Sequence, residues 1–149
     1  MIEGIKHLGE SSRGVILHHL LALDAEDRYA RFGSLIRDEG IRALVARLDF
    51  ERDLLLGIED SSHLVGLAHI GRSQGVLAEL SLSVAAHWRY QGIARTLFEC
   101  AARNVTSQGI ANFACIHGHP ATLRIANRLN LPYSFQTVDP RVIIKITIS

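Results

Sequence analysis

The feature that most constrains the fold of this chain is a change of hydrophobic period on either side of a short loop. In residues 76–85, apolar and polar residues alternate, as in a strand with one buried face. From Gly92 onward, apolar residues recur at helical spacing as far as Gly109, a residue suited to the left-handed position that ends a helix. The pattern therefore predicts a strand, a loop and a long amphipathic helix in direct succession.

The loop between these two elements has the character of an anion site. A strand–loop–helix joint directs unpaired backbone N–H groups and the positive end of the helix dipole at one spot. Gly92 leaves room for a phosphate close to the backbone, and Ala94 is the next smallest residue. Arg89 and Arg95 add positive charge. The alternative is that Gly92 merely begins the helix and that both arginines are solvated surface residues.

The other elements are predicted from the same kinds of pattern. Apolar runs predict strands at 14–21, 54–59, 64–70 and 110–117, around Phe135, and at 142–148. Further helices are predicted after Asp24 up to Phe32, after Ser34 through 41–48, and from Pro120 to about Asn130. The resulting order, β-α-α-β-β-β-α-β-α-β-β, is that of a mixed α/β or α+β layer fold. The run VIIKITI fits a core strand or the edge of a homodimer, and the core strand is favoured.

Length and composition fit one globular domain over residues 1–149, since the chain has 149 residues, of which 48% are hydrophobic and 21% charged. No apolar run approaches the ~20 residues of a membrane span, and the first residues lack the apolar stretch of a signal peptide. We therefore expect a cytoplasmic protein without membrane contact. Cys100 and Cys115 are expected to be reduced core thiols.

Charge is distributed unevenly along the chain. Residues 1–60 carry 12 acidic and 8 basic residues, net −4, whereas residues 61–149 carry 3 acidic and 8 basic residues, net +5. The total of +1 excludes a nucleic-acid-binding domain that relies on bulk positive charge, while the second half favours an anionic ligand. Glu79 is the only carboxylate between Asp60 and Glu99.

The stretch AELSLSVAAHWRYQGIARTLFECAARNVTSQGI resembles the cofactor-binding core of the GCN5-related N-acetyltransferases, the GNAT superfamily. The pattern of that family is Arg or Gln, two residues, Gly, one residue, then Gly or Ala, which Arg89, Gly92 and Ala94 satisfy. The segment DRYARFGS, with AEL on the predicted fourth strand, resembles the subgroup related to bacterial protein lysine acetyltransferases. The resemblance covers about residues 13–149. It implies a mixed, mostly antiparallel central sheet flanked by four helices, with strands four and five splayed apart after Val84.

The resemblance implies an enzyme that moves an acetyl group from acetyl-CoA to a primary amine of a small molecule or a protein, without a metal. The pantetheine arm would pair with backbone groups of Leu82 and Val84, and the pyrophosphate would lie on the N–H groups of residues 91–95. The acid-rich first sixty residues would attract a cationic acceptor. The cofactor-binding residues implied are Leu82, Ser83, Val84, Arg89, Tyr90, Gln91, Gly92, Ile93, Ala94 and Arg95.

Acetyl transfer needs a neutral amine, a polarised carbonyl and a proton for the departing thiolate. The resemblance assigns carbonyl polarisation to the backbone N–H of Val84, and it assigns proton removal, often through water, to Glu79. The alternative for Glu79 is a solvated residue on the polar face of its strand. The tyrosine that the family often uses as general acid corresponds to Ala126, so His119, Tyr133 or water is left for that role.

Two other functions compete with catalysis. The missing tyrosine, and the pair Asn130 and Leu131 in place of the common Gly-Phe pair, favour a catalytically weak acyl-CoA-binding module that regulates a partner. A third and weaker interpretation is RNA binding. It would use Arg89, Arg95 and Arg103 with Trp88.

Two histidine pairs, His117 with His119 and His18 with His19, raise the question of a metal site. Two histidines at strand spacing can share a face, but a third ligand of Cys, Asp or Glu type is not near in the sequence. Packing or capping is therefore the favoured role for these histidines, and no metal is expected.

Overall fold

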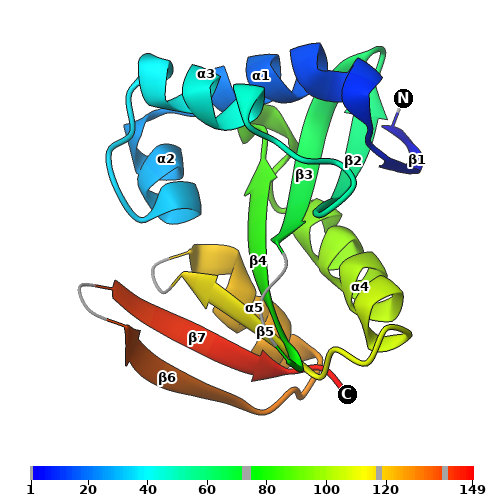
Figure 1. Ribbon diagram of the computed structural model, residues 1–149, viewed down its shortest axis with the longest axis vertical. Helices are drawn as coiled ribbons and strands as arrows, with labels where there is room; N and C mark the ends of the chain where they lie inside the picture. The colour runs from blue at the N-terminus through cyan, green and yellow to red at the C-terminus, as the bar shows by residue number, and fades with distance from the viewer. Residues whose placement is uncertain (1, 72–74, 117–118, 139–140) are drawn as a thin grey trace.

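A computed structural model, which describes residues 2–71, 75–116, 119–138 and 141–149, contains one seven-stranded sheet with helices on both faces (Figure 1). The strand order is β1-β2-β3-β4-β5-β7-β6, and every neighbouring pair is antiparallel except β4 and β5. The strands are β1 (Ile2–His7), β2 (Leu54–Asp60), β3 (His63–Gly71), β4 (Leu77–Val84), β5 (Asn112–Ile116), β6 (Tyr133–Val138) and β7 (Arg141–Thr147). This confirms the predicted mixed, mostly antiparallel α/β fold.

Five α-helices and two short 3-10 turns accompany the sheet in the described residues. They are η1 (Glu10–Ser12), α1 (Arg13–Leu21), α2 (Ala25–Phe32), α3 (Asp38–Ala46), η2 (Ala86–Trp88), α4 (Ile93–Thr106) and α5 (Pro120–Arg128). In this part of the chain, each helix is too short or too polar to cross a membrane.

The predicted strand at 14–21 is wrong, because these residues form α1, and the first strand is β1 instead. Ile16 and Leu20, one helical turn apart, are fully buried, at 0% and 1% exposure. A short apolar run is compatible with either a buried strand or a buried helix, because periodicity alone does not separate them. The extra helix explains why there are five α-helices rather than the four expected.

The other helix starts follow local capping chemistry. The carboxylate of Asp24 accepts a hydrogen bond from the backbone N–H of Asp27 at 2.9 Å, which confirms Asp24 as the N-cap of α2. Pro120 begins α5 as predicted. The cap predicted at Ser34 is wrong, since α3 begins at Asp38, whose carboxylate lies in the first turn and favours the helix dipole there.

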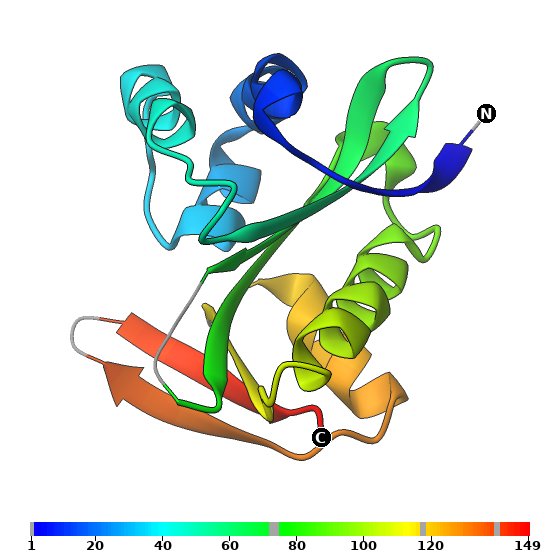
Figure 2. The same cartoon turned by 45° about the vertical axis from the view of Figure 1, so that its right-hand side comes forward.

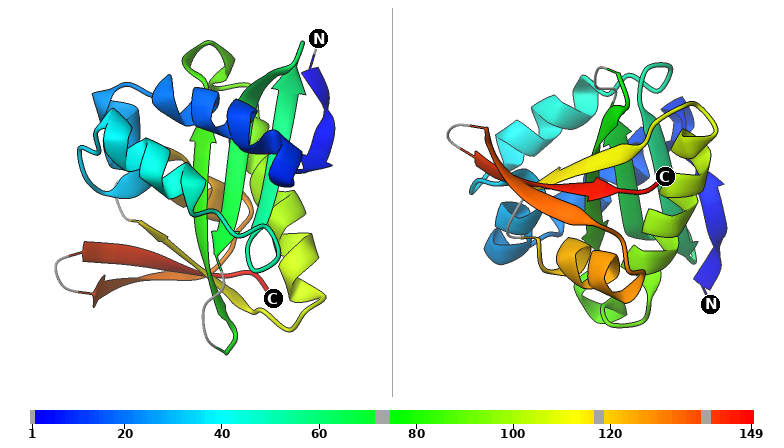
Figure 3. Two further views of the ribbon diagram at one scale, coloured as in Figure 1. Left: turned by 45° about the horizontal axis from the view of Figure 1, so that its top comes forward. Right: turned by 90° about the horizontal axis from the view of Figure 1, so that it is seen from below.

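Two apolar cores lie on opposite faces of the sheet. The turned views show α1 and α3 on one side of the strands and α4 and α5 on the other (Figures 2 and 3). On one face α4 and α5 pack against the strands, with the rings of Phe98 and Phe113 edge to face at 5.5 Å between centroids. On the other face α1 and α3 cover β2 and β3. Ile144 and Ile146 of β7 are buried between β5 and β6, which confirms the VIIKITI run as a core strand.

Strands β4 and β5 separate after only three paired positions, the last being Glu79 with Ala114. Beyond Glu79, β4 continues beside β3 to Val84, where it pairs with Gly66. The predicted splay is confirmed, but it begins after Glu79 rather than after Val84. β5 itself continues to Ile116, where, among the described residues, it is paired with β7 alone. One edge of β4 is therefore left without a strand partner.

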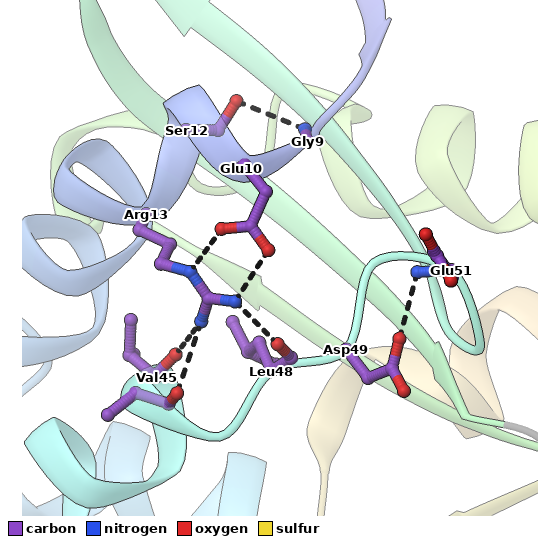
Figure 4. A network of polar contacts seen from close by, with 9 residues as sticks. Gly9, Glu10, Ser12, Arg13, Val45, Leu48, Asp49 and Glu51 are labelled. Atoms are coloured by element: carbon purple, nitrogen blue, oxygen red, sulfur yellow. Dashed lines mark hydrogen bonds and ion pairs between the residues drawn. The ribbon is translucent and has the colours of Figure 1, made fainter.

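The start of α1 is fixed by Arg13 (Figure 4). Its guanidinium donates to the Glu10 carboxylate at 2.7 and 2.8 Å and to the backbone carbonyls of Val45 and Leu48 at 2.5 and 2.7 Å. It also lies 5.0 Å from the centre of the Phe50 ring. These contacts connect α1 to the end of α3 and to the chain between α3 and β2.

Replacing Arg13 by methionine should lower the melting temperature, because the Leu48 carbonyl would lose its Arg13 donor and the Val45 carbonyl would keep only the Leu48 N–H. Glu10→Gln is the control, since it removes only a contact to an exposed carboxylate and should have the smaller effect. Thermal unfolding followed by circular dichroism measures both. Equal shifts for the two variants would show that the carbonyl contacts add nothing.

Candidate active site

A large cleft of about 1260 Å³ lies where the end of β4 meets the start of α4. Its floor includes residues 82–84 of β4, and its sides come from α2, the β4–α4 loop, the first turn of α4 and α5. The predicted strand end and the predicted anion-binding loop therefore line one cleft.

The first turn of α4 presents its backbone N–H groups without a competing carboxylate. Gly92 is the N-cap in the left-handed conformation, with φ of +82°, and a Cβ added there would meet no described atom within 4 Å. The first intrahelical bond runs from the Thr96 N–H to the Gly92 carbonyl at 3.0 Å. The N–H groups of residues 93–95 precede it and lack acceptors within the helix. Tyr90 also has a positive φ, of +61°, a strained conformation for a residue with a side chain.

The free edge of β4 faces the gap that β5 has left. The Leu82 carbonyl accepts a hydrogen bond from Nε2 of His119 at 2.7 Å, which shows the direction in which Leu82 points. Since alternate residues of a strand direct their backbone groups to the same side, the N–H of Val84 faces the same gap. The backbone of Ser83, at the alternate position, is directed towards β3, where it pairs with Leu67. The Oγ of Ser83 donates to Nε2 of His19 at 2.8 Å, while Nδ1 of His19 donates to the Leu64 carbonyl.

His119 has both ring nitrogens engaged. Nδ1 accepts from the backbone N–H of Ala121 at 3.1 Å and so caps α5, while Nε2–H donates to Leu82. Burial lowers the pKa of His119, and the positive charges of Arg31 and Arg124 lower it further. The hydrogen bond to Leu82 acts in the opposite direction but does not outweigh burial. The imidazole is therefore neutral at pH 7, with its one N–H directed at a carbonyl.

Several solved structures resemble this chain closely in fold, although not in sequence. The GNAT domain of PAT from S. lividans has a TM-score of 0.76 at 14% identity, over 96% of this chain and 89% of that one. The ribosomal-protein-S18-alanine N-acetyltransferase from Escherichia coli has a TM-score of 0.70 at 16% identity, over 100% and 95%. The chain has the GNAT fold.

A third structure with the GNAT fold carries a ligand. The PaiA N-acetyltransferase from Thermoplasma acidophilum, in complex with coenzyme A, has a TM-score of 0.68 at 16% identity, over 99% of both chains. No protein-family model and no curated protein matches the sequence.

The cleft has walls of opposite charge. Arg124 and Arg128 of α5 line one side with Arg95 of α4, whereas Glu26 and Asp27 of α2 line another. Asp27 forms an ion pair with Arg89, so the predicted cofactor residue Arg89 also connects the loop to α2. The α5 arginines and the α2 carboxylates were missed by sequence reasoning. The available signals were the four-residue spacing of the arginines and the first-turn position of the carboxylates, but neither signal shows which cleft a helix faces.

Most of the predicted cofactor residues line this cleft, with one exception. Gln91 is not part of the lining, and its side chain donates to the His87 carbonyl. The cofactor residues that line the cleft are Leu82, Ser83, Val84, Arg89, Tyr90, Gly92, Ile93, Ala94 and Arg95.

The predicted catalytic residues are less closely grouped. Val84 and His119 line the cleft, whereas Glu79 is exposed at the last position paired with β5 and does not line it. Its role as base stays a prediction. Ala126, at the position of the family tyrosine, is fully buried in the core, and Tyr133 lies on β6, outside the cleft lining.

The histidine pairs show no metal site in the part of the chain that the structure describes. No group of three His, Cys, Asp or Glu side chains there is placed to hold a metal ion. The ring of His18 lies 5.9 Å from that of His63, while His19 is buried, so the two neighbours diverge. His117 lies outside the described residues, so its pairing with His119 is not tested.

Replacing His119 by alanine should lower the free energy of unfolding by about 1 kcal/mol, the usual cost of a lost N-cap. Urea titration at pH 7 measures it. His119→Ser, which can still cap α5, should recover part of this loss. If serine is no better than alanine, the capping bond to Ala121 is not what stabilises α5.

Proposed function

We propose that this protein is an N-acetyltransferase that moves the acetyl group of acetyl-CoA to a primary amine of a small molecule or a protein. The observation that carries this proposal is the opening of two sets of backbone N–H groups into one cleft. One is the first turn of α4 after Gly92, and the other is the edge of β4 at Leu82 and Val84, which has no strand partner there. The two carbonyls on this edge already accept hydrogen bonds from His119 and Arg89. The first set suits a phosphate and the second set suits an amide-containing arm.

Acetyl-CoA fits this arrangement in one direction. Its pyrophosphate lies on the N–H groups of residues 93–95, where Arg95, Arg124 and Arg128 add positive charge. Its pantetheine arm follows the free edge of β4 towards Val84. The contact predicted for the Leu82 carbonyl is shared with His119, which already donates to that oxygen.

The reaction follows from the same geometry. The thioester carbonyl accepts a hydrogen bond from the Val84 N–H, the neutral amine attacks the carbonyl carbon, a C–N bond forms and the C–S bond breaks. The attacking nitrogen gives up one proton to water, with Glu79 as the proposed final acceptor. A thiolate with a pKa of roughly 8–9 leaves without an acid. Because the N–H of His119 is directed at the Leu82 carbonyl, we assign the protonation of the departing thiolate to water. Glu26, on the α2 side, attracts a cationic acceptor, whereas Asp27 is already paired with Arg89.

The test is turnover with a panel of amines. Amine-dependent release of free CoA, together with an acetylated amine detected by mass spectrometry, supports the proposed enzyme. The second candidate, a regulatory acyl-CoA-binding module, is favoured by the buried alanine at position 126. It predicts that calorimetry detects acetyl-CoA binding while no amine increases CoA release.

Glu79→Gln should lower the turnover rate while acetyl-CoA affinity is retained. A positioned general base contributes about 10²–10⁴-fold, and Glu79 should give less because it is exposed and can act only through water. The loss should shrink as pH rises, since more of the acceptor amine is then already neutral. The measurement is the pH–rate profile of both proteins. Coinciding profiles from pH 6 to 9 would remove Glu79 from the mechanism.

A further inference from the structure

Arg31 of α2 is buried without a carboxylate partner among the described residues. Only 6% of it is exposed, and its Nε is fully buried and makes no hydrogen bond there. The one hydrogen bond of the side chain in this part of the chain runs from Nη2 to Nδ1 of His69 at 3.4 Å, which is long. A guanidinium has five N–H donors, so most of its capacity is unused.

The neighbouring Arg28 on the same helix shows what a structural arginine looks like in this protein. It donates to the carbonyls of Leu23, Ile36 and Leu21 at 2.9, 3.0 and 2.9 Å, and it pairs with Asp38 at 2.8 Å. Arg31 has no comparable set of acceptors. Its guanidinium lies 4.6 Å from the centre of the Phe32 ring, a contact that attracts the positive charge but brings no carboxylate. A buried cation without a carboxylate partner among the described residues is expensive in folding free energy, so it needs another explanation.

Apart from the Phe32 ring, the charge of Arg31 is balanced only indirectly within the described residues. His69, which accepts from Arg31, donates through Nε2 to the Asp53 carboxylate at 2.9 Å. Burial lowers the pKa of Arg31 to about 10, so it remains charged at pH 7. Its charge also contributes, after burial, to the lowered pKa of His19, His69 and His119. These histidines are therefore neutral at pH 7, and none of them balances the charge of Arg31.

Arg31 lines a small cavity directly behind the large cleft. The cavity has a volume of about 10 Å³, roughly the space of one water molecule or one carboxylate oxygen. It shares Ala30, Leu82 and His119 with the cleft. Figure 1 shows α2 on the side of β4 towards which β5 diverges, and α2 contacts both strands. The guanidinium thus lies next to the β4 residues that would hold the acyl group.

We propose that Arg31 binds a carboxylate of the substrate, so that the acyl group or the amine acceptor of this enzyme carries a carboxylate. Arg31 does not itself line the cleft, so the contact would be made by one carboxylate oxygen that enters the small cavity and accepts from the Nε–H, which has no acceptor among the described residues, while the rest of the carboxylate stays in the cleft. The inference rests on the proposed function, because it places the carboxylate at the acyl end of the acetyl-CoA cleft. The carboxylate has two possible sources, the acyl chain of the donor and the amine acceptor.

Calorimetry with two pairs of probes tests the proposal and separates these sources. The donor arm compares succinyl-CoA with acetyl-CoA, and the acceptor arm compares alanine with alaninamide in the presence of CoA. In one arm, the carboxylate probe should bind at least tenfold more tightly than its neutral counterpart. Arg31→Met should abolish this ratio, whereas Arg42→Met, which removes an exposed charge on α3, should preserve it.

The unliganded Arg31→Met protein should melt no lower than wild type, because an apolar side chain would replace a buried unpaired charge. Arg31→Lys keeps the charge but loses the planar fork, so its ratio should fall below that of wild type. An unchanged ratio in either variant overturns the proposal.

Equal affinities within both pairs for the wild-type protein also overturn it, whatever the variants do, and indicate that water alone fills the small cavity. This failure is distinct from failure of the proposed function. If acetyl-CoA binds and neither pair differs, only the role of Arg31 is wrong. If neither CoA thioester binds, both the role of Arg31 and the proposed function are wrong.

Discussion

Gly92→Glu should weaken acetyl-CoA binding 10- to 100-fold, about 1.4–2.8 kcal/mol. The new side chain would enter the open space above Gly92, place a negative charge where the pyrophosphate lies, and oppose the φ of +82° that glycine tolerates. Calorimetry with acetyl-CoA, on protein whose fold is checked by circular dichroism, measures the change.

Gly109→Glu is the matched control for this prediction. Gly109 follows the other end of α4, has a φ of +87°, is exposed, and also has open space where a Cβ would be. It carries the same backbone cost but lies outside the cleft lining. Its acetyl-CoA affinity should equal that of wild type. If Gly92→Glu also binds acetyl-CoA like wild type, the anion site lies elsewhere.

Acid should destabilise the protein strongly between about pH 6.5 and pH 4. Burial lowers the pKa of His19 to about 4, and the charges of Arg31 and His18 add to this shift, against the hydrogen bond to Leu64. The folded state therefore binds fewer protons than the unfolded state over this interval, and stability falls with falling pH. The loss from His19 alone is roughly 3 kcal/mol. Burial also lowers the pKa of His69 and of His119, which adds to the loss in the same direction.

Urea titrations from pH 7.5 to pH 4 test this expectation. His19→Gln removes the titrating group, so stability should be lower at pH 7 but should fall less steeply with acid. Ser83→Ala removes the partner of Nε2 and leaves His19 able to titrate, so its slope should stay close to that of wild type. A wild-type slope that His19→Gln does not reduce would contradict the assignment to His19.

The sequence predicted those parts of the site that depend on neighbours in the chain. The period change around Gly92 and the alternation in β4 are local patterns, and they located the first turn of α4 and the strand edge correctly. The loop placed Arg89 in the cleft, although not its ion pair with Asp27, which joins two distant segments. A pattern that repeats within a few residues predicts a helix or a strand because local backbone geometry produces it.

The rest depends on tertiary contacts that a single sequence does not record. His119 was a candidate acid, yet both of its nitrogens are engaged, one by Leu82 of a different element. Arg31 gave no signal of its own, because its isolation exists only once α2 lies over β4 and β5. The apolar run at 14–21 became a helix because its packing against β3 decides between two compatible periods.

The short pairing of β4 with β5 also has a mechanical consequence. The sheet has two parts, β1 to β4 and β5 to β7, which are joined at three residue pairs that end at Glu79 and Ala114. Beyond this joint, the hydrogen bond from His119 to Leu82 connects the two parts. A cosubstrate arm that pairs with β4 would stiffen the sheet at this joint, so that cosubstrate occupancy and the rigidity of the sheet would rise together. Amide hydrogen exchange at residues 80–84 should then become slower when the cosubstrate binds.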